Sequence, residues 1–238
     1  MTVIKVADLS VGLLNKYDHT RWLCEDYVTD EPPVITVEAT EEEIDREIDI
    51  SGVKAPRGYF ESIVLYRALA ERLPEFGGVV FHGAVIALDG VAYAVTARSG
   101  VGKTTHLSLW LESFGDDVHI LNGDKPVLRV IDGRVYACGT PWRGKESYGV
   151  NEMLPLGGIA FLSRAEKNSA VAVTPREVLN EFISQAYIPK NPLGARLGLI
   201  ALDKILGSTP LYRLYVNMDP EAAHVARRAF TENKTSKI

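Results

Sequence analysis

The feature that most constrains this chain is a glycine-lysine-threonine segment, Ala97–Thr105 (ARSGVGKTT), between two segments of different periodicity. A continuous apolar stretch before it predicts a buried strand, and apolar residues at helical spacing follow it. A strand, a glycine-rich turn and a helix in this order are typical of a phosphate-binding P-loop, which predicts an α/β fold. Ala97 stands where the first glycine of the pattern is usual, and its methyl group fits if its φ is negative.

The residue types in this loop suit a nucleotide triphosphate. Glycines let backbone amides curl around an anion without a Cβ clash, and the start of the following helix adds a positive dipole. Lys103 would reach the β- and γ-phosphates, and the Thr104 hydroxyl would coordinate magnesium. We therefore expect ATP, or a close relative, and Mg²⁺ as cofactors. The residues expected to bind them are Arg98, Ser99, Gly100, Val101, Gly102, Lys103, Thr104 and Thr105.

The rest of the chain shows strand and helix patterns in mixed order. Apolar runs predict strands at Val79–Leu88, Val91–Thr96, Val118–Leu121, Val127–Ile131, Val135–Cys138, Ile159–Leu162 and Leu211–Val216. Asp89-Gly90 and Asp132-Gly133 predict tight turns between strands. Helical spacing predicts a helix over residues 56–73. Further helices are predicted to start at the cap-then-proline pairs Thr174-Pro175, Asn191-Pro192 and Asp219-Pro220.

The N-terminal part has a different character. Short apolar runs at Val3–Val6 and Val34–Val37, between polar stretches, predict a few antiparallel strands. The acidic run Glu41–Asp49 predicts a solvated face of a short helix or a loop. We therefore divide the chain into a β-rich N-terminal region, residues 1–55, and a catalytic domain, residues 56–238. The last residues, 234–238, are expected to fray.

Composition limits the classes of partner. The formal net charge is −5, so the chain as a whole has no electrostatic reason to seek nucleic acid. No stretch approaches the roughly 18 consecutive apolar residues of a membrane span. The N-terminus lacks a basic stretch followed by a long apolar run, and two cysteines are too few for a disulfide framework. These features predict a cytoplasmic protein that binds neither nucleic acid nor membrane.

A second candidate for chemistry follows the loop at the end of a predicted strand. Asp124, in Asn122–Lys125, could there coordinate Mg²⁺ or accept the proton of an attacking hydroxyl. Asn-Gly-Asp is also a turn-forming sequence in its own right, so a purely structural role for Asp124 stays open.

Together these segments resemble a known family. Phe81–Ala84, a strand hairpin, Ser99–Thr104 and a strand ending in an aspartate are similar to the catalytic domain of HPr kinase/phosphorylase. The same core resembles that of phosphoenolpyruvate carboxykinase, although Lys125 stands where that family has a second aspartate. The segment Gly139–Glu146 is similar to a proline-tryptophan-x-glycine-lysine segment of small kinases related to HPr kinase. The resemblance covers residues 60–162.

The resemblance implies an α/β fold with an HPr kinase/phosphoenolpyruvate carboxykinase-like P-loop core, a mixed sheet and a small β-rich N-terminal region. It implies an Mg-dependent ATP kinase that transfers the γ-phosphoryl group to a hydroxyl of a peptide or carrier-protein serine, or of a small molecule. Asp124 would be the general base or a metal ligand, with Thr104 as the other ligand. The further catalytic residues would be His82, Lys103, Arg143 and Lys145. Copies of the chain could also form a homo-oligomer.

Other interpretations of the same residues stay open. His82 could be a histidine whose hydrogen bonds are satisfied at a strand start, and Arg143 and Lys145 could be exposed basic residues in a turn. The chain could be a regulatory module that binds nucleotide with little or no turnover. Lys125 favours that function, because its ammonium could take the place of a second metal ion. An ATP hydrolase would need a water-positioning residue that the sequence does not identify.

Overall fold

The structure is a computed structural model that describes residues 1–98 and 100–232. Ser99 of the predicted loop and the end expected to fray, 234–238, lie outside the described residues. The helices are α1 (Asp18–Leu23), α2 (Glu41–Ser51), α3 (Arg57–Arg72), α4 (Lys103–Phe114), α5 (Pro175–Gln185), α6 (Pro192–Ser208) and α7 (Glu221–Glu232). The strands are β1 (Thr2–Val6), β2 (Leu9–Leu14), β3 (Ile35–Glu38), β4 (Gly78–Val80), β5 (Ala84–Leu88), β6 (Val91–Thr96), β7 (Val118–Asn122), β8 (Val127–Ile131), β9 (Arg134–Cys138), β10 (Met153–Arg164), β11 (Ser169–Ala172) and β12 (Leu211–Val216). None of the described helices is both long and apolar enough to cross a bilayer.

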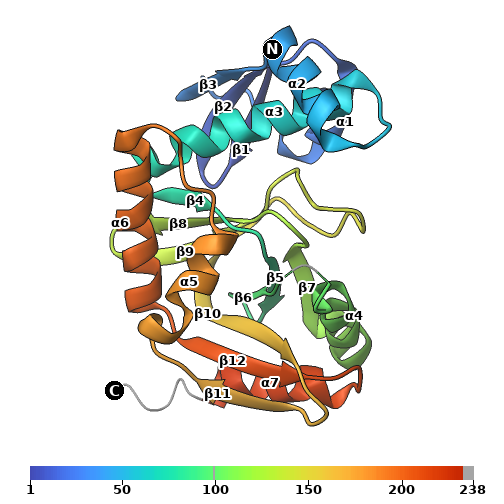
Figure 1. Cartoon of the computed structure of the whole chain (residues 1–238), viewed down its shortest axis with the longest axis vertical. Helices are drawn as coiled ribbons and strands as arrows, with labels where there is room; N and C mark the ends of the chain where they lie inside the picture. Colours follow the sequence, from blue (N-terminus) through green and yellow to red (C-terminus); the bar gives the residue numbers. More distant parts are fainter. Residues whose placement is uncertain (99, 233–238) are drawn as a thin grey trace.

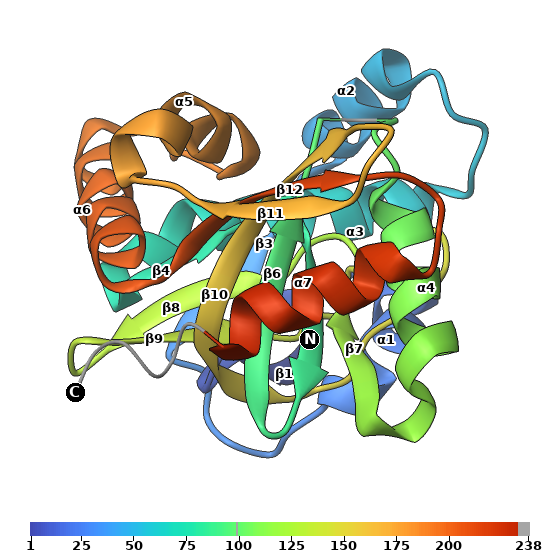
Figure 2. The ribbon, with the colours of Figure 1, turned by 90° about the horizontal axis from the view of Figure 1, so that it is seen from below.

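The larger sheet has the strand order β4-β8-β9-β10-β6-β5-β7, and β12 followed by β11 extends it from β10. The long strand β10 joins the two halves of this sheet. It begins antiparallel to β9 and continues parallel to β6 and β12. Helices α5 and α6 lie on one side of the curled sheet and α4 lies on the other (Figures 1 and 2). The fold is therefore α/β with a mixed sheet, which confirms these two features of the predicted fold class.

Each face of this sheet has its own hydrophobic core. One core packs α4 and α7 around Trp110 and Phe230, and the other packs α5 and α6 around Phe182. Strand β6 contributes Tyr93 and Val95 to the first core and its intervening alanines to the second, as the two-residue period of a strand requires. Burial on both faces explains why the strands on either side of the Asp89-Gly90 turn consist of continuous apolar runs.

The N-terminal strands form a separate sheet at one end of the molecule (Figure 1). Strands β1 and β2 are antiparallel, as predicted for this region, but β2 and β3 are parallel, which corrects the prediction for the second pairing. The core under this sheet includes Ile4 and Leu13 together with Phe60 and Leu65 of α3. The sheet and α3 thus share a core across residue 55, and the division of the chain at that residue stays a prediction.

The acidic run of the N-terminal part is helix α2. Thr40 caps it, because the Thr40 hydroxyl accepts from the Glu43 amide while the Glu43 carboxylate accepts from the Thr40 amide. The helix does not present acidic residues to solvent on every side. Ile44 is fully buried, and the largely buried carboxylate of Glu47 pairs with Arg67 of α3. Helix α2 therefore packs on α3.

The predicted run Val79–Leu88 is not one strand but two, β4 and β5, separated by a bend at His82-Gly83. The His82 amide donates to the Gln185 carbonyl at 2.6 Å, and the Gly83 amide donates to the Asp124 carbonyl at 3.1 Å. A Cβ at Gly83 would lie 2.6 Å from the Phe81 ring, so the bend requires glycine. These long-range hydrogen bonds interrupt the strand. The apolar pattern of the run does not predict them, because both partners lie far away in the sequence.

The local turn and cap patterns are confirmed. Asp89 and Gly90 have φ values of 51° and 71°, which is the geometry of a tight hairpin between β5 and β6. The Thr174 amide donates to the Glu177 carboxylate at 2.7 Å at the start of α5. The Asn191 side chain accepts from the Gly194 amide at 2.7 Å at the start of α6. Strand β11, whose sequence is short and partly polar, was not among the predicted elements, and neither were β2 and α1.

We predict that Phe182→Ala destabilises the protein strongly. The Phe182 side chain is fully buried on α5, and its ring centroid lies 5.1 Å from that of Phe81. Removal of a buried phenyl ring leaves a cavity and should lower the free energy of unfolding by about 3–5 kcal/mol, measured by urea denaturation. Leu179→Ala on the same helix is the control, because Leu179 is 43% exposed and should cost much less. Equal losses from both variants would contradict this packing.

Candidate functional site

The loop from Ala97 to Gly102 joins β6 to α4, and we call it the glycine-rich loop. Gly100 and Gly102 have φ values of 80° and 119°, a region that favours glycine, and Gly102 caps α4. Ala97 does not have a positive φ, as its methyl group requires. The loop therefore ends at the N-terminus of a 12-residue helix, where backbone amides and the helix dipole favour an anion.

Four side chains, His82, Lys103, Asp124 and Lys125, meet beside this loop, and we call them the His82–Asp124 cluster. The His82 Nε2 lies 3.3 Å from Asp124 Oδ1 and 3.2 Å from Lys103 Nζ. The Lys125 Nζ donates to Asp124 Oδ2 at 2.8 Å. The four residues come from the bend before β5, the first position of α4 and the turn after β7. The structure thus brings together three of the predicted catalytic residues, His82, Lys103 and Asp124, with Lys125, the residue considered from the sequence as a substitute for a second metal ion.

Two buried polar residues brace the turn that carries Asp124. The Asn122 Oδ1 accepts from the amides of Asp124 and Lys125 at 2.9 and 2.7 Å. Its Nδ2 donates to the carbonyl and hydroxyl oxygens of Thr140, both at 3.1 Å, and the Thr140 hydroxyl donates to the Lys125 carbonyl. Sequence reasoning recognised a turn-forming Asn-Gly-Asp but not this support. These hydrogen bonds hold the backbone of the turn from which the Asp124 side chain projects.

The cluster changes the acidity of its members. Burial acts to raise the pKa of Asp124, but the hydrogen bonds from His82 and Lys125 and the Lys125 charge outweigh it, so that pKa lies well below its usual range. Burial lowers the pKa of Lys103, the Asp124 carboxylate opposes this effect, and the Lys125 charge adds to it. Asp124 is consequently ionised at neutral pH, with both carboxylate oxygens already engaged.

The structure does not bring Arg143 and Lys145 into the cluster. The Arg143 guanidinium pairs with Asp26 at 2.6 Å and lies over the Tyr27 ring, 5.5 Å from its centroid. Lys145 is exposed in the same connection between β9 and β10. Their predicted part in catalysis stays a prediction.

The connection between β9 and β10 nevertheless covers the turn that carries Asp124. A Cβ at Gly144 would lie 2.9 Å from the Cβ of Asp124, so only glycine allows this close approach. The Gly123 amide donates to the Tyr148 carbonyl at 3.0 Å. The Trp142 Nε1 donates to the Ser62 carbonyl of α3 at 3.0 Å and anchors the connection.

Asp124 supplies the carboxylate that the His82–Asp124 cluster offers to a metal ion. Among the described residues, no group of three or more His, Cys, Asp or Glu side chains could hold a metal ion. The donors fit the kind of Mg²⁺ site in which one or two protein ligands bind the ion and phosphate oxygens and water complete its coordination. Asp124 and the exposed Thr104, in the first turn of α4, would be those ligands. A cation at Asp124 would compete with Lys125 for the carboxylate.

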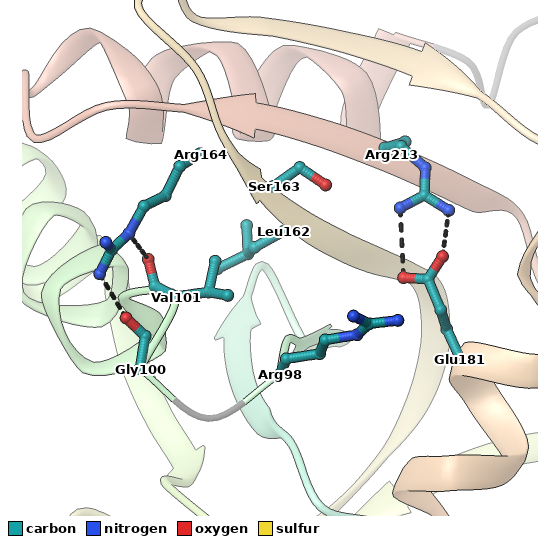
Figure 3. Close-up of a pocket in the computed structure, with 8 residues that line it drawn as sticks. All are labelled: Arg98, Gly100, Val101, Leu162, Ser163, Arg164, Glu181 and Arg213. Atoms are coloured by element: carbon teal, nitrogen blue, oxygen red, sulfur yellow. Dashed lines mark hydrogen bonds and ion pairs between the residues drawn. The ribbon is translucent and has the colours of Figure 1, made fainter.

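Two cavities lie against the glycine-rich loop, and both are lined by Val101 and Arg164. The first has a volume of about 530 Å³ and is lined by Arg98, Gly100, Val101, Leu162, Ser163, Arg164, Glu181 and Arg213 (Figure 3). The second has a volume of about 370 Å³ and is lined by Val101, Gly102, Thr105, His106, Arg164, Ala165, Val216, Asn217 and Met218. The Arg164 guanidinium donates to the carbonyls of Gly100 and Val101. Sequence reasoning missed Arg164, Glu181 and Arg213, for which no local pattern exists.

Comparison with known proteins gives a distant likeness. No family model matches the chain, and no curated protein matches it. Among solved structures, the Hpr(Ser) kinase/phosphatase from Coxiella burnetii is similar over 65% of this chain and 98% of that chain, with 11% identity and a TM-score of 0.37. The relationship is structural and distant, and it identifies neither a substrate nor a reaction.

The lowered pKa of Asp124 predicts a specific pH dependence of stability. An acid whose pKa is lower in the folded than in the unfolded state stabilises the fold above its ordinary pKa, here 3.8. That stabilisation is lost as the pH falls through the lower, folded value. The free energy of unfolding should therefore exceed that of Asp124→Asn at neutral pH, and the difference should shrink below about pH 4.

Urea unfolding of both proteins across this pH range measures the difference. The variant Asp30→Asn is the control, because Asp30 is exposed on the N-terminal part and lies outside the cluster. A difference that grows as the pH falls would mean that the partners of Asp124 do not favour its ionised form.

Proposed function

We propose that this chain is an ATP-dependent phosphotransferase that transfers the γ-phosphoryl group to a hydroxyl acceptor. One observation carries the proposal: Lys103, the residue that follows the glycine-rich loop, and Asp124 both lie within 3.3 Å of the same His82 Nε2. A phosphate-binding lysine and a carboxylate in such proximity can hold a phosphoryl group and the hydroxyl that attacks it.

The proposed nucleotide site uses both the loop and the second cavity. The triphosphate would lie against the loop amides and the N-terminus of α4, and Lys103 would contact the β- and γ-phosphates. Arg98 and Thr105 would add contacts at the two ends of the loop. The second cavity, partly walled by Val101, Val216 and Met218, would take the base. Magnesium, held by Thr104 with phosphate oxygens and water, would neutralise phosphate charge; coordination of the ion by Asp124 is the alternative to a role for that carboxylate as the base.

The proposed transfer needs little covalent chemistry from the protein. The acceptor oxygen forms a bond to the γ-phosphorus, the bond from that phosphorus to the β,γ-bridging oxygen breaks, and ADP leaves. Asp124 accepts the proton of the acceptor hydroxyl. Its lowered pKa makes it a weak base, but a loose phosphoryl-transfer transition state depends mainly on positioning and charge neutralisation. His82 and Lys125 hold the carboxylate in place for that step.

A second candidate function is a regulatory module that binds nucleotide with little or no turnover. The specific observation in its favour is the ion pair of Lys125 with Asp124 Oδ2, at 2.8 Å. A fixed ammonium at this carboxylate supplies positive charge without a metal ion and occupies an oxygen that a metal ion would need. Under either function we propose a cytoplasmic protein, able to self-associate, whose hydroxyl acceptor, if any, is a peptide, a carrier protein or a small molecule.

Phosphoryl transfer from γ-labelled ATP tests the role of Asp124. We expect Asp124→Asn to lower kcat by roughly 10²–10⁴-fold, the usual contribution of a positioned acid or base, while ATP still binds. Lys103→Ala should lose ATP affinity, because the phosphates lose their cation. The exposed Lys54→Ala is a control for the loss of a lysine elsewhere. Unimpaired transfer by Asp124→Asn would remove Asp124 from the mechanism.

Chelation of divalent cations separates the two candidate functions. A magnesium-dependent phosphotransferase should lose transfer in EDTA and regain it when Mg²⁺ is restored. ATP affinity that is unchanged in EDTA, with no turnover on any hydroxyl compound in Mg²⁺, would instead identify the regulatory module. Equilibrium binding of labelled ATP and transfer assays on the same preparation give both measurements.

A further inference from the structure

The first cavity is lined by three arginines, Arg98, Arg164 and Arg213, and we call it the arginine cavity (Figure 3). The chain as a whole has a net charge of −5, so this grouping of positive charge runs against its average. A volume of about 530 Å³ lies within the range of small-ligand sites. Ser163 also lines the cavity and adds a hydroxyl.

The charges of the arginine cavity are only partly compensated. The Arg213 guanidinium makes two hydrogen bonds to the Glu181 carboxylate, at 2.5 and 3.2 Å. Arg164 donates to two carbonyls of the loop, which satisfy hydrogen bonds without cancelling its charge. Neither Arg164 nor Arg98 forms an ion pair with any residue that the structure describes. The arginine cavity therefore favours an anionic ligand, and guanidinium groups pair well with carboxylates as well as with phosphates.

Two of the elements that line the arginine cavity also carry or contact residues of the His82–Asp124 cluster. Helix α5 carries Glu181 and ends at Gln185, whose carbonyl accepts from the His82 amide at 2.6 Å. Gly100 and Val101 of the glycine-rich loop line the opposite side, and Lys103 follows this loop as the first residue of α4. In Figure 3 the Arg98 side chain extends from the loop toward the side where Glu181 and Arg213 lie. The second cavity lies at the first turn of α4. If the base of the nucleotide occupies it, the arginine cavity is available to another substrate.

We propose that the arginine cavity binds an anionic group of the phosphoryl acceptor. The acceptor is then a hydroxyl compound that carries a carboxylate near its hydroxyl, such as a serine beside acidic residues or a free hydroxy acid. This assignment rests on the phosphotransferase function proposed above and names its substrate class. Glu181 holds the Arg213 guanidinium in place, and a bound carboxylate shares that guanidinium.

Binding to the nucleotide-loaded protein tests the proposal without turnover. The protein is saturated with Mg²⁺ and a non-hydrolysable ATP analogue, and fluorescence anisotropy follows a labelled peptide with serine between aspartates. We expect this peptide to bind and a matched peptide with lysines in place of aspartates not to bind. Arg213→Gln should weaken binding about tenfold, as expected for the loss of a hydrogen bond between charged groups. Glu181→Gln should strengthen binding, because it frees the charge of Arg213.

The controls and outcomes separate this proposal from the function on which it rests. Arg134→Gln removes an exposed arginine on β9 and should leave peptide binding unchanged. Unchanged affinity for the ATP analogue shows that each variant is folded. Competition by glycerate but not by glycerol would identify a free hydroxy acid as an occupant, and competition only by acidic peptides would identify a peptide.

The assignment is overturned by equal binding of the acidic and basic peptides, by no binding of either peptide together with none of labelled glycerate, or by no response to both Arg213→Gln and Glu181→Gln. Acidic peptide that binds only without nucleotide would make the arginine cavity part of the nucleotide site, so the acceptor assignment would fail while the phosphotransferase function stands. Failure of the ATP analogue itself to bind would instead count against that function.

Discussion

Two hydrogen bonds at the bend between β4 and β5 connect the parts of this molecule that form the candidate site. The His82 amide reaches the end of α5, and the Gly83 amide reaches the carbonyl of Asp124. These hydrogen bonds connect helix α5, on one face of the larger sheet, to the turn after β7. They also hold His82 beside the glycine-rich loop. Because Gly83 has no room for a side chain, any other residue would force this bend to open.

Local chemistry accounts for the features that the sequence predicted correctly. The glycines of the loop, the Asp89-Gly90 hairpin and the caps at Thr174 and Asn191 depend on neighbours within a few residues. The parallel pairing of β2 with β3, the bend at His82-Gly83 and the change of partners along β10 depend on distant segments, and no local pattern encodes them. Asp124 was selected from its place at the end of a predicted strand, and His82 from the resemblance. Nothing in the sequence pointed to Arg164, Glu181 or Arg213, which approach one another only through the tertiary fold.

Lys125 gives the candidate site an electrostatic character of its own. It lies beside Asp124 in sequence and in space, and it helps to hold the pKa of that carboxyl low. The cluster thus contains two lysines for one carboxylate, so its balance is positive before any ligand arrives. A positive balance of charge favours an anionic ligand, and it bears on both functions proposed for the chain.

The N-terminal part of the chain anchors the connection between β9 and β10 that covers Asp124. Arg143 pairs with Asp26, 117 positions away, and Trp142 is anchored to α3, which itself packs under the N-terminal sheet. The N-terminal part therefore supports the candidate site through this connection. Truncation at the predicted boundary would cut through a shared core and release the connection, so the smallest unit that can present Asp124 as described includes the N-terminal sheet.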